Sequence, residues 1–574
     1  MARPPRRGRQ PEAHRGGHEA TSQAARVPAS RCPLGTIRLV DFYQEPFTAE
    51  EISVLSPFFS NVDRPVFALI NLPEVVKGAL FARYSRSSKS LRRLFLDEFL
   101  ADAETGIAMI ARRIGTNDPL YSLRKAERLY DRVFFEFGDD SVAQLGGAHI
   151  ACEQASNLLT KVLERGRLAA YLEQSTRYIY YDTKLGDRYR YMIPPEIAAS
   201  DHAAAYRRIL DLLFDAYSQV VRRMTDIYAQ RFPRRDDPLG VWKATIRAKA
   251  CDAARGLLPA STLSNVGIYA SGQAYEMALM RMQAHPLVEV REYGDMMLNE
   301  LRTVIPSFLR RVDVEDRGVV WSEYLAETEA AIRSIVADLG ETPDPQPLVT
   351  LTDWDPEAEV KLVAAALYSA SNLPDAQLLR IANAMPMDER AKVITAMVGN
   401  RSNRRHRPGR AMERPMYRFD VLCDYGAFRD LQRHRMLTID WQELTTDHGQ
   451  DAPHDLADAG LTDSWNRAMA EAAAFHNTLK RSVGSTVAQY VVPFGFNIRF
   501  VMEMNAREAF HLLELRSQPA GHPGYRKVVQ EMHRQIGQVA GHHLIADAMR
   551  YVDYSEPDLE RLDSERRAAR RRKS

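Results

Sequence analysis

The chain has 574 residues, which exceeds one ordinary domain and predicts two large ones, each with enough apolar residues for a core. No apolar run approaches the roughly 20 residues that span a bilayer, and four cysteines lie far apart without a C-x-x-C pair, so we expect a soluble cytoplasmic protein without a disulfide framework, zinc cluster or other metal site. The net charge of +2 combines two basic ends with an acidic body, which is not typical of a nucleic-acid-binding domain.

The two basic ends are predicted to be peripheral. Residues 1–36 carry seven arginines against Glu12 and Glu19 and few large apolar residues, so we expect this segment to be disordered. Its Arg-rich, acid-poor composition resembles that of a transit peptide. The alternatives are a solvated tail and a start codon assigned too early. The tail Arg566–Lys573 is expected to extend the last helix into solvent, with a weak nucleic-acid contact as the alternative.

Apolar residues recur at helical intervals in three segments, Ala126–Phe137, Ala203–Arg231 and Lys527–Arg550. Segments rich in Tyr, Ile and Val are shorter, and they predict strands at Tyr178–Tyr181, Tyr189–Ile193 and Met416–Leu422. The chain is therefore expected to have an α+β fold that is mostly helical.

Two polar stretches interrupt these segments. Three prolines and a glycine in Gly340–Pro347 end a helix and favour an extended linker, and Thr445–Asp455 is expected to be a surface loop. The predicted organisation is a basic N-terminal segment, a first domain, a linker, a second domain and a basic tail, at residues 1–36, 37–339, 340–348, 349–555 and 556–574.

Short motifs recur in the same order in both halves. Arg165-Gly166-Arg167 returns as Arg433-His434-Arg435, and Leu257-Leu258-Pro259 returns as Val491-Val492-Pro493. About two dozen residues after each proline, a helix is expected to end at Arg281 or Arg516. A repeat of this length exceeds solenoid periods and indicates tandem duplication of a domain.

These motifs resemble the signature of the flavin-dependent thymidylate synthases, R-H-R-x-x-S-x-N-E-x-S-x-R-Y. The first copy reads RGRLAAYLEQSTRY from Arg165 to Tyr178, and it keeps both arginines and the Glu-x-Ser-x-Arg-Tyr end. The second copy reads RHRMLTIDWQELTT from Arg433 to Thr446, and it keeps the Arg-His-Arg start, with Thr438 and Asp440 as near-substitutes, but loses the Glu-x-Ser-x-Arg end. The signature is thus divided between the two copies.

The family's downstream pattern, R-x-x-L-P followed by N-x-R and L-x-L-R, is divided in the same way. The first copy keeps Arg255 before its proline, where the second copy has Gln489. The second copy keeps Asn505-Ala506-Arg507 and Leu513–Arg516, where the first has Ser271-Gly272-Gln273 in place of N-x-R. Each copy retains what the other has lost.

The resemblance implies two tandem domains, each with helices packed on a small antiparallel sheet. It also implies FAD as the cofactor, dUMP as the substrate, methylenetetrahydrofolate as the carbon donor and NADPH as the reductant, with dTMP as the product. Guanidinium groups suit the phosphates of these ligands because they form bidentate, charge-assisted hydrogen bonds. The flavin carries the difficult chemistry, and the protein positions the reactants.

The resemblance assigns a role to each matching position. The implied catalytic residues are Arg433, His434 and Arg516. The implied flavin-binding residues are Arg433, His434, Arg435, Glu173, Asn505 and Arg507. The implied substrate-binding residues are Glu173, Ser175, Thr176, Arg177, Arg255 and Arg516.

Active sites of the family form between subunits of a homotetramer. We therefore expect composite sites, in which one copy supplies Arg-His-Arg and the other supplies Glu-x-Ser-x-Arg, in a homodimer that mimics the tetramer. Two alternatives stay open because Gly166 and Ala170 remove polar groups from the first copy. One is a flavin- or nucleotide-binding paralogue without synthase activity, and the other is an inactive scaffold whose basic tails contact nucleic acid.

Overall fold

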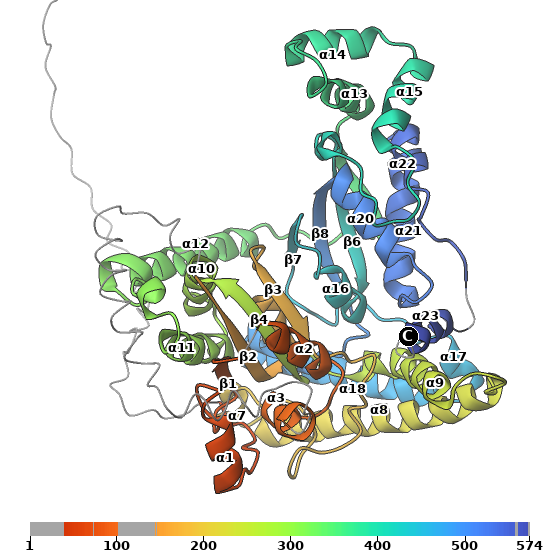
Figure 1. The fold of residues 1–574 in the computed structure, drawn as a ribbon. Coiled ribbons are helices and arrows are strands. Elements are labelled where there is room, and N and C mark those ends of the chain that lie inside the picture. Colours follow the sequence, from red (N-terminus) through yellow and green to blue (C-terminus); the bar gives the residue numbers. More distant parts are fainter. Residues whose placement is uncertain are drawn as a thin grey trace, which may run out of the picture. The chain divides into compact units, whose positions relative to one another are not determined.

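The computed structural model describes residues 40–72, 74–100, 144, 146–556, 559 and 561–571 (Figure 1). The basic segment 1–36 and the predicted helix Ala126–Phe137 lie outside these residues. Within them, no helix combines the length and the apolar composition that crossing a membrane requires.

Two antiparallel sheets of four strands have the same topology. The first has the order β1-β2-β4-β3, and the second has the equivalent order β5-β6-β8-β7. The strands of the first sheet are β1 (Val66–Leu69), β2 (Gly147–Ser156), β3 (Ala169–Glu173) and β4 (Leu263–Ser271). Those of the second are β5 (Val349–Trp354), β6 (Met416–Asp424), β7 (Thr438–Trp441) and β8 (Asn497–Asn505). The expected tandem fold is confirmed.

Equivalent helices follow equivalent strands, and side-chain caps fix where they begin. Ser156 caps α6 (Asn157–Leu163) after β2, and Asp424 caps α16 (Tyr425–Leu431) after β6. In the same way, Ser271 caps α10 (Gly272–Gln283) and Asn505 caps α20 (Ala506–Arg516). Each cap oxygen accepts a hydrogen bond from a free N–H of the first turn. The Arg-x-Arg motifs follow α6 and α16.

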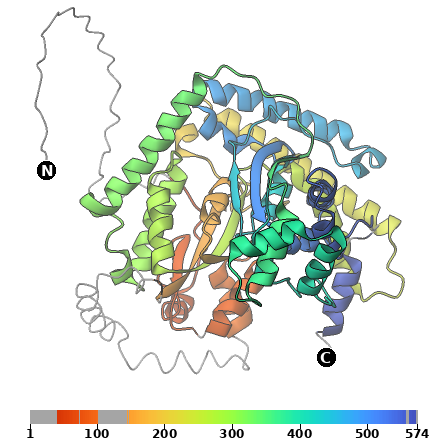
Figure 2. The same ribbon diagram turned by 90° about the horizontal axis from the view of Figure 1, so that it is seen from above.

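Further helices, long and short, surround the sheets. The first half contributes α1 (Ala49–Leu55), α2 (Glu74–Tyr84), α3 (Leu91–Leu94), α7 (Pro195–Ala198), α8 (Ala203–Arg231), α9 (Leu239–Ala254), α11 (Val288–Arg302) and α12 (Val320–Ala337). The second contributes α13 (Ala358–Tyr368), α14 (Asp375–Ala384), α15 (Met387–Val398), α17 (Asp455–Asp458), α18 (Thr462–Ser482), α19 (Ser485–Ala488), α21 (Pro523–Gln538), α22 (His543–Ala548) and α23 (Leu562–Arg571). Helices α8 and α18 contact each other and run side by side in Figure 2.

One apolar core includes side chains from both halves, and a smaller one lies among α1, α2 and α3. The halves also share an antiparallel bridge between Pro259 and Pro493. Ala260 N donates to the Val492 carbonyl at 2.8 Å, and reciprocally Phe494 N donates to the Leu258 carbonyl at 2.9 Å.

The hydrogen bonds continue outward with the same reciprocity. Ser261 N donates to the Tyr490 carbonyl and Gly495 N donates to the Gly256 carbonyl, both at 2.9 Å. A Cβ atom on Gly256 would overlap the ring of Trp465, so the close approach requires glycine there. The two copies are thus related by an approximate two-fold axis at the two prolines.

Several local predictions are confirmed. Helix α8 matches Ala203–Arg231, and β6 covers Met416–Leu422. Gly340–Pro347 contains neither helix nor strand, and Thr445–Asp455 is a loop up to the start of α17. The exact domain boundaries stay a prediction.

Two predicted strands are wrong. Tyr178–Tyr181 contains no strand: Tyr178 ends a turn after β3, in which its N donates to the Ser175 carbonyl at 3.2 Å, and the residues after it are irregular. Tyr189–Ile193 contributes only the isolated bridge between Tyr191 and Thr262. Tyr181 and Tyr191 are buried, so these aromatic residues reflect packing in the core rather than strand pairing.

Two helix predictions need correction. The predicted helix Lys527–Arg550 is divided into α21 and α22, because Gly541 between them has a φ of 73°, outside helical geometry. The C-terminal tail does not extend that helix into solvent. It forms the separate helix α23, which packs on α9, and Arg566 Nε donates to Asp237 Oδ1 at 2.6 Å.

Candidate functional site

The two retained parts of the signature lie together inside a single chain. Glu173, at the end of β3, is buried, and its carboxylate accepts hydrogen bonds from Arg429 at 2.8 Å and from Arg433 at 3.1 Å. Lys161 lies 3.4 Å from the same carboxylate. Burial alone would raise the pKa of Glu173, but Arg429, Lys161 and Arg433 hold it well below its usual range. Glu173 is therefore ionised and links the copies.

Two further contacts join α16 and the segment after it to β3 and the turn after it. The Arg435 guanidinium donates to the Ala169 carbonyl and lies over the Tyr171 ring, 5.8 Å from its centroid. Thr176 Oγ1 accepts a hydrogen bond from Arg429 at 3.2 Å. The second copy's arginines thus dock on the first copy's strand.

Arg177 is buried and forms a bidentate ion pair with Asp252, at 2.6 and 2.5 Å. Its Nη1 donates to the hydroxyl of Tyr525, on α21 of the second copy, at 3.1 Å. Burial opposes the charge, but Arg177 holds the pKa of Asp252 below its usual range, so the pair is ionised. Ser175 Oγ accepts from Arg177 N at 3.3 Å, which braces the turn.

Asp430 lies at the centre of the arginines. Arg255 Nη1 donates to its Oδ2 at 3.3 Å. Although burial would raise the pKa of Asp430, Arg433, Arg255 and Arg177 lower it far below its usual range. Within the part of the chain that the structure describes, the buried Arg255 Nη2 has no hydrogen-bond partner, and it is a free donor for an anion.

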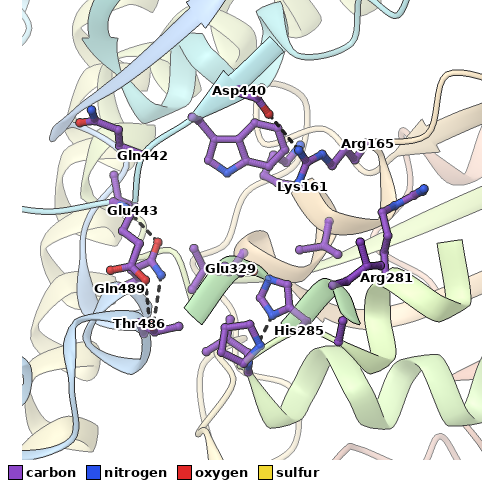
Figure 3. Close-up of a pocket in the computed structure, with 18 of the residues that line it drawn as sticks. Lys161, Arg165, Arg281, His285, Glu329, Asp440, Gln442, Glu443, Thr486 and Gln489 are labelled. Carbon is purple, nitrogen blue, oxygen red and sulfur yellow. Dashed lines mark hydrogen bonds and ion pairs between the residues drawn. The ribbon is translucent and has the colours of Figure 1, made fainter. Parts of the chain in front are cut away.

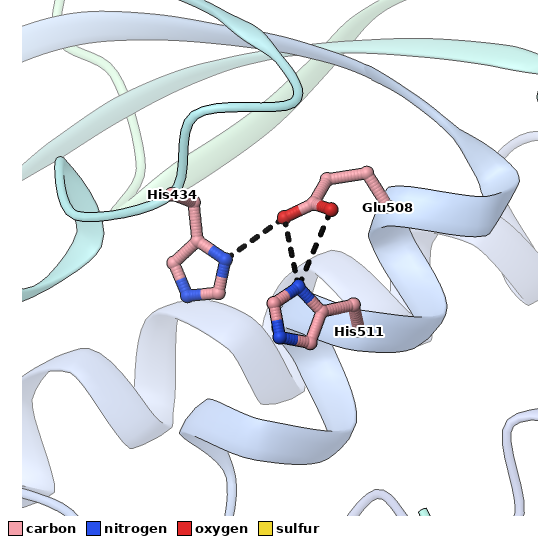
Figure 4. Close-up of side chains that lie close together, drawn as sticks. All are labelled: His434, Glu508 and His511. Carbon is pink, nitrogen blue, oxygen red and sulfur yellow. Dashed lines mark hydrogen bonds and ion pairs between the residues drawn. The ribbon is translucent and has the colours of Figure 1, made fainter. Parts of the chain in front are cut away.

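His434 is held between Glu508 and Arg516 (Figure 4 shows the acidic side). Its Nδ1 lies 2.9 Å from Glu508 Oε1, and Arg516 Nε donates to its Nε2 at 3.0 Å. Burial and Arg516 lower the pKa of His434 to about 4, against the hydrogen bond to Glu508. We therefore assign a neutral imidazole with the proton on Nδ1. His434 fixes the direction of Arg516.

His434, Glu508 and His511 also form a group whose possible ligand atoms lie within 4.8 Å of one another (Figure 4). Such a group suits a divalent transition metal. However, Glu508 already accepts from both imidazoles, and the Arg516 guanidinium beside His434 repels a cation. We interpret the group as a hydrogen-bond network, and the absence of a metal site stays a prediction.

Two predicted residues lie differently. Asn505 caps α20 by accepting from Glu508 N at 2.9 Å, so it supports the network indirectly. The Arg507 guanidinium donates to the Pro408 carbonyl and pairs with Glu413, and among the described residues neither contact is with the groups around Glu173 or Asp430. The flavin-binding roles assigned to both stay predictions.

Sequence reasoning missed the partners that fix the charged groups: Lys161, Asp252, Arg429, Asp430, Glu508, His511 and Tyr525. Two signals were present in the sequence. Arg429 and Asp430 lie in α16, about one helical turn before Arg433, and Asp252 precedes Arg255 by a similar interval.

Two regions of the chain match one family of known proteins. A sequence model of the family described as "Thymidylate synthase complementing protein" matches the chain twice, over residues 94–307 and 348–541. The chain is 37% identical over 533 residues to a UPF0159 protein of Chlamydia pneumoniae, covering 91% of this chain and 98% of that relative. It is 29% identical over 518 residues to a UPF0159 protein of Thermoplasma acidophilum, covering 85% and 97%.

Two further similarities extend over about the length of one copy. A flavin-dependent thymidylate synthase of Clostridium tetani is 24% identical over 181 residues, which is 31% of this chain and 67% of that protein. The solved structure of a UMP/dUMP methylase from Streptomyces cacaoi, bound with 5-Br dUMP, is 18% identical and covers 36% of this chain and 96% of its own, with a TM-score of 0.28. The first family match contains β2, β3 and β4, the second contains all four strands of the second sheet, and together they span more than half of the residues. The chain therefore belongs to the thymidylate synthase complementing protein family, the flavin-dependent thymidylate synthases, as a tandem duplication with each copy partly degenerate.

Proposed function

We propose that the chain is an FAD-dependent thymidylate synthase. It would convert dUMP, methylenetetrahydrofolate, NADPH and a proton to dTMP, tetrahydrofolate and NADP⁺. The observation that carries the proposal is the contact between Glu173 and Arg433, because it unites the two signature fragments in one place. Neither copy alone holds a full set of these groups.

Free cationic donors support phosphate binding. Arg255 Nη2 has no partner among the described residues, and no described carboxylate pairs with Arg516. Burial lowers the pKa of Arg516, which means that its charge is incompletely compensated. A phosphate dianion would supply the missing counter-charge through charge-assisted hydrogen bonds. Arg255 and Arg516 are the proposed dUMP-binding donors, and Arg177, Ser175 and Thr176 stay proposed substrate-binding residues.

The residues also fit a flavin dinucleotide. The Arg433 side chain is 38% exposed, and Arg435 forms no ion pair with a described carboxylate, so both can receive its pyrophosphate. Neutral His434 between them can face an uncharged ring system without the cost of burying a charge. When bound, FAD would supply the reducing equivalents for methyl formation.

Glu173 is a positioning group rather than a proton donor in this proposal. Three cations keep it ionised, so it has no proton to give near neutral pH. The Glu173 side chain is 0% exposed, so its carboxylate does not face a ligand directly. Glu173 would orient the ligands by fixing the positions of Arg429 and Arg433.

One complete set of motif residues per chain supports a homodimer that mimics the family's homotetramer. We also propose a cytoplasmic location, which the isolated cysteines support. Cys152, Cys251 and Cys423 are free and buried.

A nucleotide-binding paralogue without synthase activity is the second candidate. It is favoured by the close pairing of Arg177 with Asp252, because a fully engaged guanidinium has less to offer a phosphate. In that case dUMP would bind without turnover.

Flavin content and dTMP formation test these candidates. The purified full chain, reconstituted with FAD, is expected to show flavin absorbance and to form dTMP from dUMP, methylenetetrahydrofolate and NADPH. Arg177→Ala should abolish dTMP formation, whereas the exposed Arg405→Gln should retain it. A flavoprotein without dTMP formation would support the paralogue, and a colourless chain that cannot be reconstituted would refute both flavin-dependent readings.

A further inference from the structure

The two-fold axis predicts a second place where an Arg-x-Arg segment of one copy contacts the equivalent strand of the other, with the two copies exchanged. Arg165-Gly166-Arg167 lies opposite β7 of the second copy, where Arg165 Nη2 donates to Asp440 at 2.8 Å and Arg167 donates to Thr438 Oγ1 at 3.1 Å. A cavity of about 730 Å³, which we call the second cavity, opens beside these contacts (Figure 3). Its labelled lining residues include Lys161, Arg165, Arg281, Glu443 and Gln489.

The strand registers identify equivalent positions in the two sites. Glu173 lies opposite Val266, the fourth residue of β4, and Trp441 lies opposite Phe500, the fourth residue of β8. Trp441 therefore stands where the composite site has Glu173. An ionised carboxylate has been replaced by an aromatic ring.

The phosphate-binding side has changed as well. Gln489 begins the short helix after α19, as Arg255 begins the one after α9, so an uncharged amide replaces a guanidinium. Glu443 stands where the first copy has Ser175, and it accepts hydrogen bonds from Arg333 at 2.9 Å and Thr486 at 2.6 Å. Burial opposes ionisation, but Thr486 and Arg333 lower the pKa of Glu443. A carboxylate here repels a phosphate placed as in the composite site.

A cationic side remains on the opposite wall. Figure 3 places Arg165 and Arg281 away from Glu443 and Gln489. Among the described residues no carboxylate pairs with Arg281, and burial together with the charge of Arg165 lowers the pKa of Arg281. The Arg165 guanidinium also lies 5.4 Å from the centroid of the Trp441 ring. An anion near Arg281 would relieve this uncompensated charge.

We propose that the second cavity binds a planar heteroaromatic anion, with its ring against Trp441 and its anionic group on Arg165 and Arg281. The apolar lining of Leu158, Ala278 and Leu325 suits the ring, and the two arginines suit either a carboxylate or a phosphate. The second cavity has a ligand of its own and does not repeat the composite site. This proposal does not depend on synthase activity.

Calorimetric titration of the full chain tests it, with 5-formyltetrahydrofolate as the carboxylate probe and dTMP as the phosphate probe. At least one probe is expected to bind at a site that Arg281→Gln weakens at least about tenfold, since a charge-assisted hydrogen bond is lost. Ala278→Phe fills the cavity without changing charge and should weaken the same binding. Arg177→Ala, in the composite site, and the exposed Arg405→Gln should leave it intact.

The two probes separate the ligand classes, since the one that responds to Arg281→Gln identifies carboxylate or phosphate. If Arg281→Gln is poorly folded, Ala278→Phe alone decides, because it keeps the arginine. The proposal would be overturned if Arg281→Gln and Ala278→Phe both bound the two probes as the wild-type chain does. It would also be overturned if Arg177→Ala abolished all binding of the probes.

Discussion

Pro259 of the first copy and Pro493 of the second face each other in an antiparallel bridge, at the centre of reciprocal hydrogen bonds between the copies. The two copies therefore associate within one chain as subunits associate in a dimer. This association depends on the shared apolar core and on the reciprocal hydrogen bonds around the two prolines rather than on the linker.

Cleavage of the linker tests that association. A protease site inserted in the exposed segment Gly340–Pro347 should be cut readily, yet the two fragments should stay together because the core is shared. Size-exclusion chromatography of the nicked protein should give the elution volume of the intact chain. Fragments that separate without denaturant would contradict this view of the interface.

Loss of the Glu173 charge should damage both stability and activity. Glu173→Gln leaves Arg429, Arg433 and Lys161 facing a neutral amide, and unpairing such buried ions costs about 3–5 kcal/mol. Urea denaturation should show the loss, and dTMP formation should fall at least about 100-fold. Asp440→Asn is the matched control, because its ion pair with Arg165 is exposed and worth at most about 1 kcal/mol. Equal destabilisation by the two substitutions would argue against a buried cross-copy link.

A buried glutamate predicts a pH dependence of stability. Glu289 accepts from Ser156 N at 2.9 Å and Oγ at 2.6 Å, and from Tyr490 of the other copy at 2.7 Å. Burial raises its pKa from the ordinary 4.5 to about 7, against the hydrogen bonds. Between these values the folded state holds a proton that the unfolded chain has released, so unfolding free energy falls as pH rises.

Glu289→Gln should lack this pH dependence of the unfolding free energy. From pH 4.5 to pH 7 the unfolding free energy of the wild-type chain should fall by about 1–3 kcal/mol more than that of Glu289→Gln. Urea denaturation at both pH values measures this difference. A constant difference between the two proteins would mean that Glu289 titrates normally in the folded state.

His434 should stay neutral at physiological pH. Burial and Arg516 lower its pKa to about 4, so its nitrogen NMR shifts should be constant between pH 5.5 and 8.5, with the proton on Nδ1. Glu508→Gln removes the carboxylate that favours the charged form and should lower the pKa further. Titration of His434 near pH 6.5 would refute the assigned network.

The sequence was sufficient for the duplication, because Arg433-His434-Arg435 and the segment Glu173–Arg177 are local motifs that survive in order. It was insufficient for Asp252 and Asp430, whose importance depends on which guanidinium groups the fold brings to them. The strand predicted at Tyr178–Tyr181 failed for a related reason. Tyrosine favours strands because it packs well, and here it packs without pairing.

The central claim is that complementary halves of the signature, one from each copy, make one working site. The most direct test compares dTMP formation by Arg435→Ala and Arg167→Ala, two arginines at equivalent positions. Arg435 lies in the composite site and Arg167 beside the second cavity. Arg435→Ala should lower the rate at least about 100-fold and Arg167→Ala by less than about threefold. Equal losses from the two substitutions would contradict the claim.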